Sequence, residues 1–197
     1  RDVAPSRGLG DVYKRQGMVL DWGIHLLDQA LRIGEGRKLI SVYAELTNVT
    51  NEECDDGFRV TLIFEGDLSM YVEVTTSNFI ELPRWYILGE NGSAVINDWD
   101  LNGEIVKVSD WENRDAVPIL AGVGLTKTMA PRTDDTIKHY PLPKVDSSWT
   151  QFYENVFAAL RGEEEQLITH DQQRRLLKLV DAIFESGNEN KVVFFDK

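Results

Sequence analysis

The 197-residue sequence lacks the marks of several large classes of protein. Its single cysteine, Cys54, cannot form an internal disulfide, which is typical of a reducing compartment. No apolar run approaches 18 residues, and no apolar signal-peptide stretch precedes Met18. We therefore expect a cytoplasmic location and no membrane partner. We interpret Cys54 as an incidental thiol, because nothing near it in the sequence would activate a thiolate.

Positive charge is also scarce. The chain has 21 Lys and Arg against 33 Asp and Glu, which gives a formal net charge of −12. Proteins that bind nucleic acid need clustered Lys and Arg, as do those that bind anionic membrane surfaces. We therefore expect no nucleic-acid partner.

The length suits one domain, or one domain and a remnant. Residues 1–16 hold four Arg and Lys residues and show no apolar period. Their last part, Gly10-Asp-Val-Tyr-Lys-Arg-Gln16, resembles the translated adapter sequence found at the ends of assembled sequence fragments. We expect residues 1–16 to be a non-native or disordered extension, and the natural chain to begin upstream. The domain itself should cover residues 17–197.

The segment 17–34, GMVLDWGIHLLDQALRIG, is the most informative stretch. Its Leu and Ile content, its lack of Pro and its final glycine predict a helix. Its polar side chains are spaced four, three and four residues apart: Asp21, His25, Asp28 and Arg32. This spacing puts them on one stripe of a helix that is otherwise apolar and should be buried. Since unpaired charges are costly to bury, the stripe should face a cavity or a satisfied polar network.

Three interpretations of Asp21 and His25 are open. They can form a buried polar pair that satisfies itself. A histidine with two carboxylates can bind Zn²⁺ or Mn²⁺, although no other His or Cys is near. The pair can also be a general acid–base site, because imidazole titrates near neutral pH and a nearby carboxylate orients it. Gly23 lies between them and leaves room for a ligand or another backbone to approach.

The segment after this helix has the period of two that is typical of strands. Strands are predicted at 39–47, 58–64, 68–76, 85–88, 94–96 and 105–108. Short turns join most of them, so the sheet should be mostly antiparallel. The four-proline segment 109–148 is predicted to be irregular. Its Gly122 and Gly124 are a weak phosphate-binding signal, and a flexible flap or an arm onto a partner is the alternative.

Two helices and a strand should end the chain. Residues 149–160 have a helical apolar period, with Ser147 or Ser148 as the expected cap. A capping box at Thr169–Gln172 predicts a second helix that ends at Gly187. Its predicted inward side chains are Leu176, Leu177, Val180, Ile183 and Phe184, and a last strand follows at 191–195. The order of elements predicts an α+β fold with the helices on one face.

Other candidate residues have ordinary interpretations. We interpret His139 and His170 as surface histidines, and Glu163-Glu-Glu165 as a solvated acidic turn. Trp85 is expected to be buried in the sheet, with a pocket or an oligomer interface as the alternative.

The string Asp21-Trp-Gly-Ile-His25-Leu-Leu-Asp28 resembles the D-x-G-x-H-x-x-D helix of the Gfo/Idh/MocA oxidoreductases. The following strands, the hairpin at 89–96 and the two last helices resemble the C-terminal domain of that family, over residues 17–197. The resemblance implies an α+β domain with a large, mostly antiparallel sheet and helices packed on one face.

The resemblance also implies hydride transfer between NAD or NADP and a CH–OH group of a sugar or cyclitol. His25 would exchange the hydroxyl proton, Asp21 would hold a substrate hydroxyl and orient the site, and Asp28 would contact the substrate. An imidazole near its operating pKa suits that proton transfer, and the nicotinamide performs the hydride step.

The family's N-terminal Rossmann domain, with its Gly-rich loop and Glu-Lys-Pro motif, has no counterpart in this sequence. We therefore expect the missing domain to bind the cofactor, the fragment to bind none and to be inactive alone, and a homo-oligomer to form through the sheet face. The alternatives are a non-catalytic binding or dimerisation module and a metal-dependent lyase or isomerase.

Overall fold

A computed structural model describes residues 17–50, 52–110, 119–120, 125–126 and 134–195. The expectations for residues 1–16, and those for Gly122 and Gly124, lie outside these ranges. The described chain forms two compact units. The first consists of the residues up to Phe79 and those from Trp149 onward, and the second is Ile80–Ser148.

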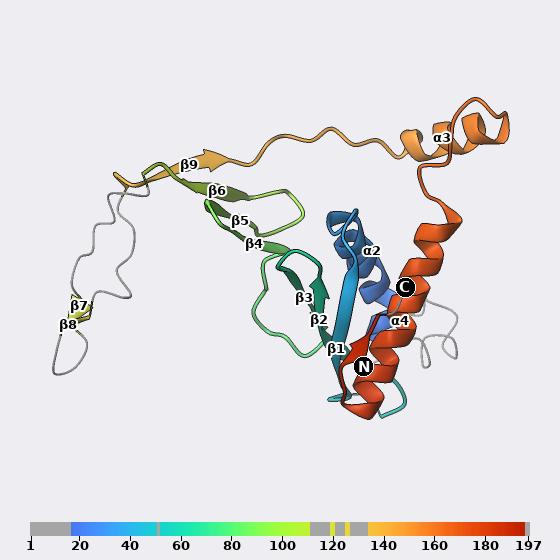
Figure 1. Ribbon diagram of the computed structural model, residues 1–197, viewed down its shortest axis with the longest axis horizontal. Helices are drawn as coiled ribbons and strands as arrows, with labels where there is room; N and C mark the ends of the chain where they lie inside the picture. Colours follow the sequence, from blue (N-terminus) through green and yellow to red (C-terminus); the bar gives the residue numbers. More distant parts are fainter. Residues whose placement is uncertain (1–16, 51, 111–118, 121–124, 127–133, 196–197) are drawn as a thin grey trace. The chain divides into compact units, whose positions relative to one another are not determined.

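The first unit combines one sheet with helices from both ends of its sequence (Figure 1). Its elements are a π-helix η1 (Val19–Gly23), α2 (Ile24–Ile33), β1 (Leu39–Thr47), β2 (Gly57–Phe64), β3 (Leu68–Thr75), α3 (Thr150–Leu160), α4 (His170–Glu189) and β10 (Val193–Phe194). The sheet has the order β10-β1-β2-β3 and every pairing is antiparallel. The predicted hairpin is confirmed, with Phe64 opposite Leu68 at its turn.

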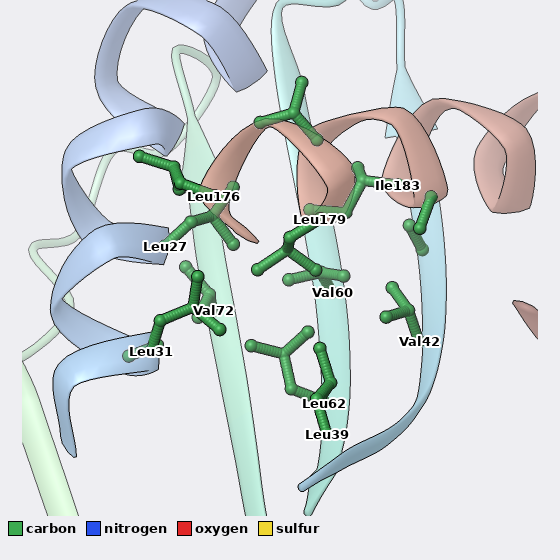
Figure 2. Packing of buried hydrophobic residues seen from close by; sticks show 14 of the residues in the cluster. Leu27, Leu31, Leu39, Val42, Val60, Leu62, Val72, Leu176, Leu179 and Ile183 are labelled. Carbon is green, nitrogen blue, oxygen red and sulfur yellow. The ribbon is translucent and has the colours of Figure 1, made fainter. Parts of the chain in front are cut away.

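The core of this unit lies between one face of the sheet and the helices α2 and α4, which contact each other. The period of two on β2 puts four apolar side chains on the inner face, all at most 2% exposed: Phe58, Val60, Leu62 and Phe64. Figure 2 shows Leu27 and Leu31 of α2 and Leu176, Leu179 and Ile183 of α4 gathered over the strands. Full burial of such a side chain stabilises the fold by about 1.5–3 kcal/mol.

The opposite face of the same sheet is open. Alternate residues of β2 and β3 lie there as cross-strand pairs, with Arg59 opposite Glu73 and Thr61 opposite Tyr71. The Arg59 Nε donates to Oε1 of Glu73 at 2.9 Å, and the pair holds the pKa of Arg59 above its usual value. Partial burial, and then the Glu73 carboxylate, raise the pKa of Tyr71.

The long helix α4 begins and ends with specific polar contacts. The predicted capping box is confirmed, because Thr169 Oγ1 accepts from the Gln172 backbone N–H and Gln172 Oε1 accepts from that of Thr169. The predicted end at Gly187 is wrong. The helix continues to Glu189, and Asn190 ends it in the left-handed conformation (φ 50°) common after helices.

The inward face of α4 differs at one position from the prediction. Leu176, Val180 and Ile183 are buried as expected, but Leu177 is 54% exposed and Leu179 is buried in its place. These buried positions follow the i, i+3, i+4, i+7 rule of an amphipathic helix. A buried serine, Ser186, joins the helix to the sheet: its Oγ accepts from Ala44 N at 2.8 Å and donates to the Lys191 carbonyl at 2.6 Å.

The predicted helix at 149–160 is confirmed as α3, but its surroundings differ from the expectation. Trp149 is its N-cap and no side chain caps it, so neither Ser147 nor Ser148 has the predicted role. Its apolar face is largely exposed, with Trp149 at 90% and Phe157 at 58%. An amphipathic period identifies an apolar face but not the surface that covers it.

The second unit is a four-stranded antiparallel sheet of order β4-β5-β6-β9 with a separate two-stranded pair β7-β8. Its strands are β4 (Trp85–Gly89), β5 (Gly92–Ile96), β6 (Gly103–Val108), β7 (Ile119–Leu120), β8 (Leu125–Thr126) and β9 (Ile137–Pro141). The strand β9 lies within the segment predicted to be irregular. It is an edge strand, where a proline such as Pro141 is tolerated. Trp85 is half-buried.

All described strand pairs are antiparallel and α2 and α4 lie on one face of their sheet, so the α+β prediction is confirmed. The strands form two separate four-stranded sheets and one pair rather than one continuous ladder. Among the helices in the described ranges, none is long and apolar enough to cross a bilayer.

Replacing Leu179 by Ala should lower the free energy of unfolding by about 2–5 kcal/mol, because removal of this fully buried side chain leaves a cavity. The matched control is Leu177→Ala on the exposed side of the same helix, which should change it by less than about 0.5 kcal/mol. Urea denaturation followed by circular dichroism measures both values. Equal losses would show that the inward face is assigned wrongly.

Candidate functional site

The three predicted site residues lie on one continuous helical segment of the first unit. Asp21 lies within η1, His25 follows in the first turn of α2, and Asp28 lies one turn further along. Asp21 is half-buried and His25 is exposed. The Asp28 carboxylate forms an ion pair with Arg32, with 2.9 Å between Oδ2 and Nε. The segment thus presents an acidic and imidazole stripe away from the core.

The segment is less buried than its composition predicts. Val19, Leu27, Ala30 and Leu31 are buried against the core, whereas Trp22 is 49% and Ile33 is 55% exposed. The interpretation of Asp21 and His25 as a buried pair is therefore wrong, because His25 lies at the surface. Within the described residues, no cluster of three or more His, Cys, Asp or Glu side chains has the arrangement of a metal site.

A π-helical turn follows Gly17 and Met18 in this segment, and the spacing of the polar residues does not predict it. Its five residues Val19–Gly23 include Asp21 and end two residues before His25. In a π-helix the hydrogen bonds run from i to i+5, and such short stretches are frequent at functional sites. The wider turn changes the direction of Asp21 relative to His25 from that of a regular α-helix.

Gly23 allows the segment to lie directly on β2. A Cβ at this position would lie 2.7 Å from Cε1 of Phe58, which is closer than two non-bonded carbon atoms approach. The ring of Phe58 therefore takes the space that the sequence left for a ligand or a backbone. Phe58 is 1% exposed, so the contact fixes the inner side of the helix and leaves the stripe on the outer side.

Asp55 is a residue at this site that the sequence analysis missed. It is 9% exposed, and its Oδ2 accepts a hydrogen bond from the Val19 backbone N–H at 2.8 Å. Its carbonyl accepts another from the Met18 N–H at 3.0 Å. The sequence places Asp55 in an acidic loop, and only the pairing of two aspartates directly before a strand hinted at more than a solvated turn.

The neighbouring Asp56 holds this loop in place. Its carboxylate accepts from the backbone N–H and the hydroxyl of Thr50, and from the hydroxyl of Thr47 at 3.3 Å. Its backbone N–H donates to the Thr47 carbonyl, and its carbonyl accepts from the backbone N–H and the hydroxyl of Thr76. The loop between β1 and β2 is thus tied to the end of each strand beside it.

The remaining candidates lie apart from this segment in the sequence. His139 is exposed on β9 with its Nδ1 2.7 Å from Oε2 of Glu104, and His170 is exposed at the first residue of α4. Both are surface histidines, as predicted. In the acidic turn, the hydrogen-bonded partner Arg161 lowers the pKa of Glu163. Cys54 is half-buried.

Comparison with known families gives one match. Residues 4–95 match the model of the GFO/IDH/MocA C-terminal domain. This range includes the β2–β3 hairpin, Asp55 and the helical segment Val19–Ile33 formed by η1 and α2, called the site helix below. A search of curated proteins gives no match.

Comparison with solved structures supports the same assignment. An NAD-binding protein from Listeria innocua is 42% identical, with a TM-score of 0.83 over 91% of this chain and 51% of that one. The WlbA dehydrogenase of Bordetella pertussis, solved with NADH and UDP-GlcNAcA, is 19% identical, with a TM-score of 0.59 over 93% of this chain and 46% of that one. An oxidoreductase from Bacillus cereus is 12% identical, with a TM-score of 0.69 over 93% and 52%.

The chain spans about half the length of these proteins. The two more distant structures show a common fold, and the Listeria protein adds close sequence similarity. The antiparallel α+β topology agrees with this domain, and the matched range contains Asp21, His25 and Asp28. The chain therefore belongs to the Gfo/Idh/MocA oxidoreductase family, of which it contains the C-terminal domain.

Proposed function

We propose that this chain is the substrate-binding and oligomerisation domain of an NAD(P)-dependent oxidoreductase that acts on a CH–OH group of a sugar or cyclitol. The observation that supports this most is the outward stripe of the site helix. Asp21 and His25 lie on a segment whose opposite side, with Val19, Gly23 and Leu27, is buried in the core. A ligand can therefore reach the stripe while the helix beneath it stays fixed.

His25 is the proposed acid–base group. In the oxidation direction, its neutral imidazole would remove the proton of the substrate hydroxyl, and a bound nicotinamide would supply the acceptor for the hydride on the hydroxyl-bearing carbon. In the reverse direction the imidazolium returns the proton to the oxygen. Imidazole suits this role because its ordinary pKa lies near neutral pH.

Asp21 is the proposed partner of a substrate hydroxyl, and Asp28 the more distant substrate contact. A carboxylate accepts hydrogen bonds from hydroxyl groups and so fixes the orientation of a polyol. Asp28 is already paired with Arg32, so in this role it would present an oxygen held by the guanidinium. Such fixed polar groups supply the orientation on which hydride transfer depends.

The proposed cofactor site lies outside this chain. The Listeria protein is an NAD-binding protein about twice as long, and the Bordetella dehydrogenase was solved with NADH and a nucleotide sugar. By this analogy, an N-terminal half would bind NAD or NADP, and the substrate class would be a sugar or cyclitol. The proposed cytoplasmic location rests on the single cysteine of the sequence.

The first experiment replaces His25 by Ala in a full-length protein with the upstream domain restored. The turnover number should fall by about 10²–10⁴-fold, because the proton acceptor is lost. The affinity for NADH should not change, since His25 is not a nucleotide contact in this proposal. Steady-state kinetics and a fluorescence titration measure the two quantities.

The matched controls for this variant are His139→Ala and His170→Ala, both at exposed surface positions. These should retain the turnover of the unmodified enzyme. Near-normal turnover of the His25→Ala variant would contradict the assigned role, and equal losses in all three would point to general destabilisation.

The second experiment titrates the isolated chain with NADH. We expect no fluorescence change at concentrations that saturate the full-length protein, because the phosphate-binding glycine loop is not in this sequence. Addition of the separately expressed N-terminal half should restore binding. Saturable binding of NADH by the isolated chain would contradict the assignment of the cofactor site to the N-terminal half.

The proposed homo-oligomer would use the open face of the first sheet, where Ile63 is 39% and Tyr71 is 60% exposed. New charges at these two positions should shift the oligomer toward monomer, because burying them in the interface would add a desolvation cost on each subunit. The test variant is Ile63→Glu with Tyr71→Glu, and the control is Leu177→Glu on the exposed side of α4. Analytical ultracentrifugation measures the mass of the oligomer. An unchanged mass for the double variant would exclude this face as the oligomer interface.

A further inference from the structure

The start of the site helix is fixed by a loop that is distant in the sequence. The first N–H groups of any helix have no partner within the helix. Here two of them are satisfied by one residue, because Met18 N–H donates to the carbonyl and Val19 N–H to the carboxylate of Asp55. Val19 and Asp55 are 36 residues apart. No side chain of the helix itself supplies this cap.

The hydrogen bond between Val19 and the Asp55 carboxylate is strong enough to fix the start of the helix on the loop. The Asp55 carboxylate is a charged acceptor, and such hydrogen bonds are roughly twice as strong as neutral ones. It is also placed at the end of the helix where a negative charge is favourable. Both Asp55 and Val19 are buried, so water does not compete freely for the bond.

The residues next to Val19 and Asp55 in the chain favour the close approach of the loop to the helix. Gly17 has φ +63°, and a Cβ there would overlap the Asp55 carboxylate, so only glycine lets the loop approach the helix this closely. On the loop side, Asp56 binds Thr47, Thr50 and Thr76 and thereby limits the movement of its neighbour.

We propose that Asp55 is a positioning residue that sets the direction of Asp21 and His25 through the π-helical turn. This inference rests on the proposed function. Asp21 lies two residues after Val19, so a change in the first turn of the helix is transmitted directly to its backbone. A displacement of about 1 Å in a reacting group can lower a rate by about 10²-fold, which makes such a support consequential.

The first test uses the chain as given and needs no catalysis. The chain has three histidines, so the imidazole NMR signals of His25, His139 and His170 can each be assigned by substitution. In Asp55→Ala, the His25 signal should move and the Val19 amide should exchange at least about tenfold faster, since a charged hydrogen bond is lost. The signals of His139 and His170 should not change.

Two further variants make this test specific. Asp55→Asn retains an uncharged acceptor, so its effects on His25 and Val19 should be intermediate between the native chain and Asp55→Ala. Glu52→Ala removes an exposed carboxylate from the same loop and should leave both readouts unchanged. If Asp55→Ala does not fold, Asp55→Asn decides: unchanged His25 and Val19 signals in it would overturn the proposal.

The second test measures kinetics in the full-length protein. Asp55→Ala should lower kcat by about 10- to 100-fold with an unchanged NADH affinity, and Asp55→Asn should recover part of that loss. Wild-type kcat in Asp55→Ala would overturn the positioning role. The two proposals fail separately: normal turnover of His25→Ala removes the catalytic assignment, whereas the NMR readouts still test the positioning by Asp55.

Discussion

The inner face of β2 is the surface on which the first unit and its candidate site both depend. Its even-numbered side chains contact the helices, and Phe58 at one end lies directly beneath Gly23. Because the ring and the glycine fit closely, this contact helps to fix the rotation of the helix about its axis. The outward direction of Asp21 and His25 thus depends on this apolar packing as well as on the hydrogen bonds between Asp55 and the start of the helix.

The parts of the fold that depend on local pattern could be predicted from the sequence. The alternation from Phe58 to Phe64 predicted β2 and its hairpin, and the Thr169–Gln172 capping box fixed the start of α4. Both signals lie within a few residues of one another, and their physical causes are local. The spacing of Asp21, His25 and Asp28 likewise predicted that they lie on one helical segment, whereas their roles at the site stay a prediction.

The parts that depend on distant contacts could not be predicted. The hydrogen bond from Val19 to Asp55 joins residues far apart in the chain, and the sequence around neither residue predicts it. The π-helical turn Val19–Gly23 begins at the residue that makes this bond and ends at the glycine that contacts the Phe58 ring. Likewise, the apolar period of α3 did not predict that its aromatic face is exposed. The period shows which side chains share a face of the helix, but not whether another segment packs on that face.

The family assignment and the geometry answer different questions. Similarity to the Listeria protein and to the domain model shows which fold and which protein family the chain belongs to. The arrangement of the site helix shows how such a domain can offer two polar groups on a rigid support. Sites placed on packed helices hold their geometry better than sites on loops, and here a loop contributes only by fixing the end of a helix.

The position of α4 at the end of the sequence also affects synthesis. Val42 pairs with Val193, and the core positions on β2 are covered by α4, more than a hundred residues later in the chain. During translation, α2 and the hairpin emerge before α4, so their apolar face stays exposed until α4 has left the ribosome. The segment 80–148 is meanwhile synthesised between the two halves of the first unit. Such a discontinuous unit folds late and slowly, since distant segments must meet before their contacts stabilise it. A chaperone would be most useful in the interval before α4 covers the sheet.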